Sequence, residues 1–250
     1  MVDIIVPAFQ EAIKLITSGD PEVYGTIYRT IYVSGAGTLL SLSWSIPIAV
    51  FLGLYSFKGK WVIRGIFNAL IGIPTVALGL ILFLIWSRQG PLGSLNLLYT
   101  LNGIAIGQSI LVTPIIISFT ANALSNSDVQ LRDLAKTLGA SGLRTNLTLI
   151  RETFWSMMLS IIAAFNRGFG ELGVATIIGG ALAGETRVLS TAIAINLNRG
   201  FFDIALAYGI VLMSIVVALA LVVSLVERVK NDDLGLRNIA FWLRQWRRKI

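Results

Sequence analysis

The sequence predicts an all-α polytopic membrane protein with five transmembrane helices, and three observations lead to this fold class. Hydrophobic residues make up 55% of the 250 residues and charged residues only 13%, whereas a soluble domain usually carries about a quarter charged residues. The apolar residues gather in long runs, several of them near the roughly 20 residues that cross the hydrocarbon core of a bilayer. The chain has no Cys and no His. It therefore lacks disulfides, thiolate or imidazole metal sites and the commonest general base.

The five predicted spans form a membrane domain over residues 31–226. They cover residues 31–55, 66–86, 101–124, 154–179 and 204–226. Pro47, Pro74 and Pro114 lie inside the first three spans. Membrane helices tolerate such prolines because neighbouring helices can satisfy the freed carbonyl groups.

The segments outside these spans are polar or short. Residues 1–30 hold an amphipathic stretch that is too short to span, followed by a turn at Gly19-Asp20-Pro21. Residues 180–202 contain too few continuous apolar residues for a span, and we expect a short helix or a re-entrant segment there. The basic, aromatic tail 227–250 suits either a helix on an anionic membrane surface or a disordered cytoplasmic tail.

The basic residues orient the predicted spans. With five spans, the loops 56–65 and 125–153 and the C-terminal tail share one side, which carries 14 Lys and Arg against five on the other. The positive-inside rule then places the N-terminus outside and the C-terminus in the cytoplasm. The net charge of +7 is thus explained by the membrane, and nucleic acid is not expected as a partner.

The longest polar segment between two apolar runs, residues 127–152, falls on the cytoplasmic side. It is expected to form two short helices joined at Gly139, a residue type that suits a helix C-cap. The first helix presents the apolar residues Leu131, Leu134, Ala135 and Leu138, and the second presents Leu143, Leu147 and Ile150. Such a helix pair suits docking to a soluble partner. The alternative is a loop that folds back on its own helices.

Two polar features lie on the predicted membrane path. Arg167 and Glu171 are an ionisable pair inside a predicted span, with Asn166 beside them. Their i, i+4 spacing would place them on one helix face, where they can pair. Buried ions of this kind either hold two helices together or line a gate or pathway. Three arginines fall at the predicted outer mouth, where they would attract an anion or act as solvated loop residues: Arg88, Arg187 and Arg199.

The chain offers no nucleotide site of its own. Gly168-Phe-Gly-Glu-Leu-Gly173 matches a dinucleotide motif by letters, but it lies within a membrane run rather than between a strand and a helix. No catalytic residue, metal site or cofactor is expected, and the chain is not predicted to be an enzyme. If ATP drives it, another subunit must bind the ATP.

The central loop resembles the EAA loop of the permeases of ABC importers. Asp133-Leu134-Ala135, three residues and then Gly139 follow the pattern Glu-Ala-Ala-x-x-x-Gly, with Asp in place of Glu, Leu in place of the first Ala, and the closing Leu-Pro missing. The resemblance implies that Leu131, Asp133, Leu134, Ala135, Leu138 and Gly139 couple the chain to a partner ATPase.

The second half is similar to molybdate and sulfate permeases, and to their tungstate branch in particular. The segments that carry the likeness are Ala164–Arg167, Gly170–Gly173, Thr186–Ile193 and Asn198–Ala207. The resemblance implies the type I importer fold: a homodimer in the plasma membrane, in contact with lipid, with two ATPase subunits and an extracytoplasmic oxyanion-binding protein. A permease for another anion (molybdate, sulfate or phosphate), a proton-coupled carrier and an integral-membrane enzyme are the alternatives.

Overall fold

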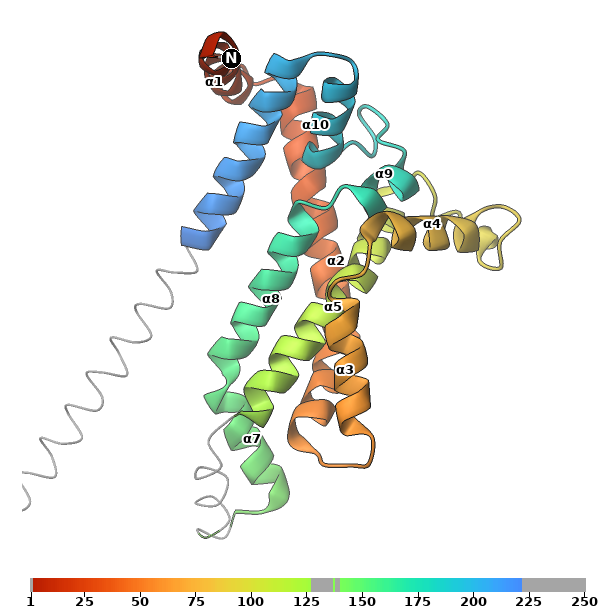
Figure 1. Cartoon of the computed structure of the whole chain (residues 1–250), viewed down its shortest axis with the longest axis vertical. Helices are drawn as coiled ribbons and strands as arrows, with labels where there is room; N and C mark the ends of the chain where they lie inside the picture. Colours follow the sequence, from red (N-terminus) through yellow and green to blue (C-terminus); the bar gives the residue numbers. More distant parts are fainter. Residues whose placement is uncertain (1, 127–136, 138–139, 222–250) are drawn as a thin grey trace, which may run out of the picture. The chain divides into compact units, whose positions relative to one another are not determined.

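The computed structural model describes residues 2–126, 137 and 140–221, and the regular elements in this part of the chain are all helical (Figure 1). The chain divides into two compact units, Met1–Leu212 and Met213–Ile250. The elements are α1 (Val2–Thr17), α2 (Pro21–Leu54), α3 (Lys60–Leu70), α4 (Thr75–Trp86), the 3-10 helix η1 (Gly93–Leu95), α5 (Leu101–Ser125), α7 (Gly142–Glu152), α8 (Phe154–Phe169), α9 (Gly173–Gly179), α10 (Leu189–Asn198) and a last helix, Phe202–Leu221.

Three of the described helices are long and apolar enough to cross a membrane: α2, α5 and Phe202–Leu221. Two further pairs qualify only together, and both are bent, α3 with α4 by 98° and α7 with α8 by 56°. By length and composition, the described residues therefore hold three candidate spans, or up to five if each bent pair counts as one. α2 begins at Pro21, earlier than the predicted residue 31, because Asp20 accepts a hydrogen bond from the Glu22 N–H at 2.8 Å and caps the helix.

The predicted span 66–86 is not one continuous helix. The helix ends at Leu70 and resumes at Thr75. Pro74 has no N–H and disfavours helical geometry in the residue before it. The intervening N–H groups of Ile71, Gly72 and Ile73 instead make short-range bonds to carbonyls three residues earlier, at 3.1–3.4 Å. The run 154–179 is likewise two helices, α8 and α9, separated by Gly170–Leu172.

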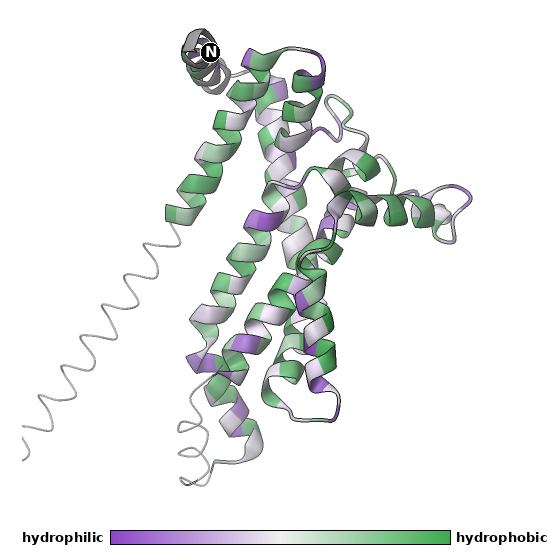
Figure 2. Ribbon diagram, viewed as in Figure 1, coloured by the Kyte–Doolittle hydropathy of each residue, from purple (hydrophilic) through white to green (hydrophobic). Residues whose placement is uncertain are grey.

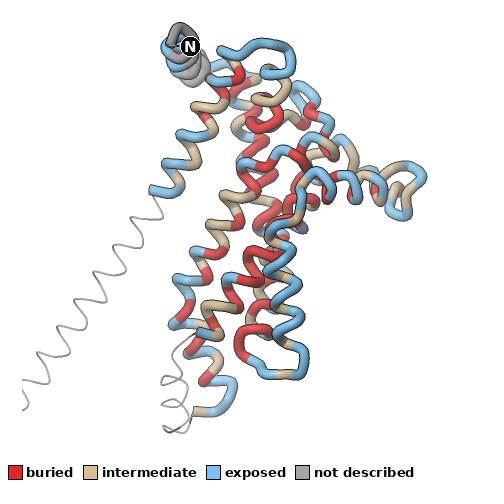
Figure 3. The backbone as a smooth tube through the Cα atoms, in the orientation of Figure 1, coloured by how far each residue is buried: buried red, intermediate tan, exposed pale blue. Residues whose placement is uncertain are grey.

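The core lies where α5 meets its neighbours. α5 packs along α2 and also contacts α3, α4, α8 and α9; buried residues follow it through most of its length (Figure 3). One apolar cluster joins α4, α5 and α9 through Leu78, Leu82, Ile104, Val174 and Ile178. α4 is hydrophobic along most of its surface (Figure 2), and several of its large apolar side chains remain exposed in the single chain. That exposure is what a helix facing lipid or another membrane subunit requires.

The two helix breaks lie side by side. A Cβ atom built on Gly173, at the start of α9, would lie 2.6 Å from Thr75 Oγ1 and 2.8 Å from the Val76 nitrogen, at the start of α4. A Cβ atom built on Gly79, one turn further along α4, would lie 3.3 Å from the Gly173 carbonyl oxygen. Only glycine permits this approach, so the crossing of α4 and α9 depends on Gly173.

We therefore expect Gly173→Ala to destabilise the protein by about 1–3 kcal/mol, the usual cost of overpacking a closely packed core. The measurement is the thermal unfolding midpoint of the purified protein in detergent. Gly142→Ala is the matched control, because Gly142 also begins a helix but a Cβ there would have no neighbour within 4 Å. Equal midpoints for the two variants would contradict this account of the crossing.

Candidate functional site

The predicted coupling residues lie outside the described residues: Leu131, Asp133, Leu134, Ala135, Leu138 and Gly139. The second predicted helix of that loop is described, as α7, and begins at an N-cap, Ser141, that accepts a hydrogen bond from the Arg144 N–H. Of its predicted apolar face, Leu143 and Leu147 are 72% and 48% exposed. Ile150 packs instead on a core cluster with the buried Leu149. α7 thus keeps two leucines uncovered in the single chain.

Arg167 and Glu171 form an ion pair, with Arg167 Nη1 and Glu171 Oε2 at 2.7 Å. The expectation that both lie on one helix is wrong, because α8 ends at Phe169. The pair still forms because the Glu171 N–H donates to the Gly168 carbonyl at 3.1 Å, which keeps the chain in a tight turn. The partners differ in exposure: the Glu171 side chain is 2% exposed and that of Arg167 37%.

Polar groups from several elements form hydrogen bonds with Glu171 and with the carbonyl groups at the break between α8 and α9. Glu171 Oε1 accepts the Val174 N–H at 3.2 Å, and the Glu171 carbonyl accepts the Ser190 hydroxyl of α10 at 2.6 Å. Gln108 of α5 donates its Nε2 to the Gly168 carbonyl at 3.1 Å. Backbone groups left free at a helix end are costly in a membrane unless such partners are present. The break is therefore a built feature of the fold.

Sequence reasoning missed Gln108 and Ser190. Gln108 could have been predicted as a buried polar partner, because it is a lone amide in the middle of an otherwise apolar run. Nothing in the sequence singles out Ser190. Gln108 Oε1 and Asn166 Oδ1 are buried and have no hydrogen-bond partner among the described residues. Asn166, which precedes Arg167 in the chain, thus has a buried side-chain oxygen without a hydrogen-bond partner among the described residues.

A seam of hydroxyl groups follows the contact between α2 and α5. Ser41 bonds Ser45 at 3.1 Å and Thr113 at 2.9 Å, and Thr113 also accepts the Trp44 indole N–H at 2.8 Å. Gly37 allows the close approach, since a Cβ there would lie 2.8 Å from the Ala105 carbonyl oxygen. Small and hydroxyl-bearing residues commonly join membrane helices in this way, so the seam reads as helix packing.

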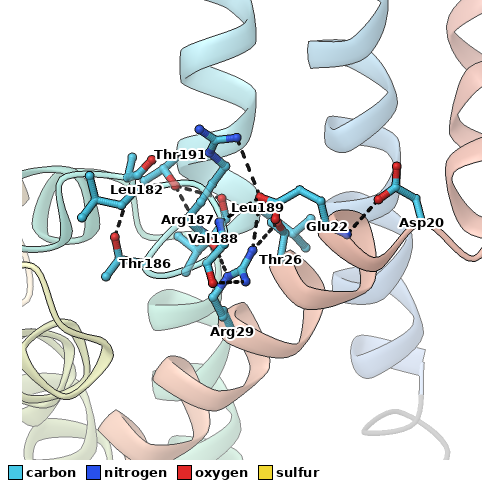
Figure 4. A network of polar contacts seen from close by, with 12 residues as sticks. Asp20, Glu22, Thr26, Arg29, Leu182, Thr186, Arg187, Val188, Leu189 and Thr191 are labelled. Carbon is cyan, nitrogen blue, oxygen red and sulfur yellow. Dashed lines mark hydrogen bonds and ion pairs between the residues drawn. The ribbon is translucent and has the colours of Figure 1, made fainter.

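The second charged assembly lies where the N-terminal turns of α2 meet the loop before α10 (Figure 4). Arg29 is 8% exposed and its guanidinium reaches that loop, donating Nε to the Arg187 carbonyl at 2.9 Å and Nη1 to the Gly184 carbonyl at 3.0 Å. Its Nη2 donates to Thr26 Oγ1 at 3.0 Å and to Glu22 Oε1 at 3.3 Å. Arg29 therefore ties the loop to α2.

The three arginines predicted at the outer mouth do not come together. Arg187 joins the Arg29 assembly, with its Nη1 at 3.8 Å from Glu22 Oε1 and its Nε donating to the Ala181 carbonyl at 3.4 Å. Arg88 and Arg199 are exposed. Sequence reasoning treated Arg29 only as a positive charge on that side. Its role rests on bonds to residues more than 150 positions away.

The described residues hold no group of three or more His, Cys, Asp or Glu side chains that could bind a metal ion. The Arg167–Glu171 pair with its neighbours and the Arg29 assembly present guanidinium N–H groups, hydroxyls and amides. Such groups recognise anions by charge and hydrogen bonds rather than by covalent chemistry. The Arg167 side chain is 37% exposed, and its guanidinium donates to one described residue, Glu171.

Residues 45–231 match the family model of the binding-protein-dependent transport system inner membrane component. The chain belongs to this family. It is 34% identical, over 227 residues, to the tungstate uptake system permease protein TupB of Peptoclostridium acidaminophilum, covering 90% of this chain and 100% of that protein. TupB of Campylobacter jejuni is also 34% identical, with 91% and 95% covered.

More distant relatives of this inner membrane component include the molybdenum permease protein ModB of Haemophilus influenzae, 27% identical over 61% of this chain and 72% of its own length. Among solved structures, a chain of the MetNI methionine ABC transporter in an inward-facing form superposes with a TM-score of 0.70, covering 85% of this chain and 97% of that one at 14% identity. At that identity the likeness shows the fold alone, which is that of an ABC transporter membrane subunit.

Proposed function

We propose that the chain is the permease subunit of an ABC importer that moves tungstate, or a related oxyanion such as molybdate, into the cytoplasm. The observation that carries the proposal is the 34% identity to a tungstate uptake permease over that protein's entire length. ATP hydrolysis on a separate subunit drives the transport, because no nucleotide-binding motif occurs in this sequence. The chain itself is a transport subunit and not an enzyme.

The working assembly in this proposal is a homodimer with two ATPase subunits and an extracytoplasmic oxyanion-binding protein, in the plasma membrane. Five spans per chain, with the N-terminus outside, follow if α3 with α4 and α7 with α8 each cross once. The coupling loop 127–152 then faces the ATPase, and the uncovered Leu143 and Leu147 of α7 support a partner contact on that side. Arg88, Arg187 and Arg199 fall at the outer mouth, and Asn166, Arg167 and Glu171 fall along the pathway.

The orientation has a direct test. A reporter that is active only outside the cytoplasm, fused behind Ile250, is expected to be inactive, because the excess of Lys and Arg holds the C-terminus inside. The same reporter fused before Met1 is expected to be active and serves as the control. The reverse pattern would overturn the orientation and, with it, the cytoplasmic location of the loop 127–152.

The function is tested by reconstituting the chain with its companion ATPase and binding protein in liposomes. Uptake of labelled tungstate is expected to require all three proteins and ATP. Competition by unlabelled molybdate, sulfate and phosphate then ranks the anions. Transport by this chain alone in response to a proton gradient would show a secondary carrier and refute the proposal.

A further inference from the structure

We propose that Arg167 binds the transported oxyanion directly and that Glu171 is a positioning residue that cancels the net charge of the site, so that the anion is held weakly and released. The inference rests on the proposed function and adds to it a binding site with a stated chemistry. The ligand class is a tetrahedral dianion.

The asymmetry of the ion pair is the first observation. A pair that only joins helices would hide both partners, yet here the carboxylate of Glu171 is 2% exposed and the Arg167 side chain 37%. The Arg167 guanidinium uses Nη1 for Glu171, and its Nε and Nη2 bond no described residue. That leaves the edge of the guanidinium that carries Nε and Nη2, which matches two oxygens of an oxyanion at once.

The second observation is how firmly Glu171 is held without Arg167. Its Oε1 accepts the Val174 N–H, its carbonyl accepts the Ser190 hydroxyl, and its own N–H donates to the Gly168 carbonyl, at 3.2, 2.6 and 3.1 Å. These three contacts hold Glu171, one of them directly at its carboxylate, and the carboxylate in turn holds Nη1 of Arg167 at 2.7 Å. A mobile arginine would lose conformational entropy on binding an anion, and this arrangement removes much of that cost.

The third observation is the place of the pair. It lies at the α8–α9 break, beside the α3–α4 break that Gly173 contacts. Non-helical backbone at membrane depth is tolerated where it is buried in protein or lines a water-filled cavity, and transporters place substrates at such interruptions. A guanidinium open to lipid would be costly, so the exposed side of Arg167 has to face water or another subunit.

The charge balance explains why the site would release the anion rather than retain it. An uncompensated arginine would hold a dianion strongly, whereas conduction requires binding that is weak enough to leave. With Glu171 ionised, the pair is neutral and attracts the anion by local hydrogen bonds more than by net charge. Glu171 therefore sets the affinity without touching the anion.

Accessibility is tested with cysteine chemistry, for which a chain without Cys is well suited. In the complex reconstituted with ATPase and binding protein, Arg167→Cys is expected to react with a water-soluble, positively charged methanethiosulfonate reagent. Ala164→Cys, at 0% exposed on the same helix, is the control and should stay unlabelled. No labelling of Arg167→Cys in an assembled complex would refute the proposal.

Binding and transport are tested with charge variants. Glu171→Gln keeps the hydrogen-bonding shape and leaves the arginine uncompensated, so labelled tungstate should bind the permease–ATPase complex more tightly while the maximal uptake rate falls. Arg167→Gln should lower the uptake rate roughly tenfold or more, the usual effect of losing hydrogen bonds to a charged group, and Arg167→Lys should rescue it only in part. Lys58→Gln, at an exposed lysine between α2 and α3, controls for loss of one positive charge.

The double exchange Arg167→Glu with Glu171→Arg separates the two roles of the pair. A purely structural pair would recover uptake in the exchanged protein, and that recovery would refute the proposal. A complex that assembles but transports nothing is the result expected here. If the unmodified complex itself imports no oxyanion, the proposed function fails; if it does import and Arg167→Gln imports equally well, only the present inference fails.

Discussion

Replacing Arg29 by methionine is expected to unfold the end of the bundle where α2 meets the loop before α10. The change removes four hydrogen bonds, leaves the Arg187 and Gly184 carbonyls without their partner, and takes from the Glu22 carboxylate one of the groups that it contacts. Breaking a buried charged pair typically costs about 3–5 kcal/mol; the partly exposed Glu22 places this case toward the lower end. A loss of that size is a large fraction of the stability of most domains. The measurements are the yield of monodisperse protein in detergent and its unfolding midpoint.

Two further variants isolate the cause. Arg29→Lys keeps the charge but offers one donor atom in place of three, so its midpoint should fall between those of wild type and Arg29→Met. Arg199→Met removes an exposed arginine at the end of α10 and should leave the midpoint close to wild type. If Arg29→Met and Arg199→Met had the same unfolding midpoint, the hydrogen bonds of Arg29 would not stabilise the contact between α2 and the loop before α10.

Ala135→Asp is expected to abolish oxyanion uptake while the permease still inserts and dimerises. Ala135 belongs to the predicted apolar face of the coupling loop, and an unpaired carboxylate placed in an apolar contact is costly. Gly139→Val is expected to act in the same way, because a β-branched residue is poorly tolerated at a position that suits glycine as a helix C-cap. The measurement is binding-protein-stimulated ATP hydrolysis in the reconstituted complex, alongside uptake.

The controls for this prediction lie on the basic side of the same loop. Lys136→Ala and Arg144→Ala should have mild effects, since solvated side chains contribute little when truncated. Normal stimulation of ATP hydrolysis in both Ala135→Asp and Gly139→Val would show that the loop is not the ATPase contact.

Much of the helical layout follows from local pattern. The turn at Gly19-Asp20-Pro21 is where the sequence places it, with Gly19 at φ +71° and Asp20 as the N-cap of α2. The segment 180–202 holds the short helix α10, as its limited apolar length indicated. These features depend on residues close in sequence, which is why they could be predicted.

The helix breaks could not be predicted from the length of the apolar runs. Three prolines looked alike in the sequence, yet Pro47 and Pro114 lie inside intact helices while Pro74 marks a 98° bend. Only at Pro74 does a glycine of another helix, Gly173, make room for the start of the next helix, at Thr75 and Val76. A run of apolar residues has the same length whether it is straight or bent, so hydropathy alone does not distinguish the two.

The site was predictable only in part, for the same reason. The Arg167–Glu171 pair follows from i, i+4 spacing and is present, whereas Gln108 and Ser190 reach it across 60 and 19 positions. Arg29 bonds loop carbonyls 155 and 158 positions away. Contacts of this range are set by how the helices pack and leave no periodic trace in the sequence.

The hydrogen bonds at the α8–α9 break also bear on the order in which the protein is made. Gln108 is synthesised 60 residues before the Gly168 carbonyl that it satisfies, whereas Ser190 follows Glu171 by 19 residues. A nascent chain that ended at α9 would therefore carry the Glu171 carbonyl without the hydroxyl that satisfies it, which would be costly within a membrane. We expect α8 and α9 to settle only after α10 has left the ribosome, which makes this break a late step in the biogenesis of the subunit.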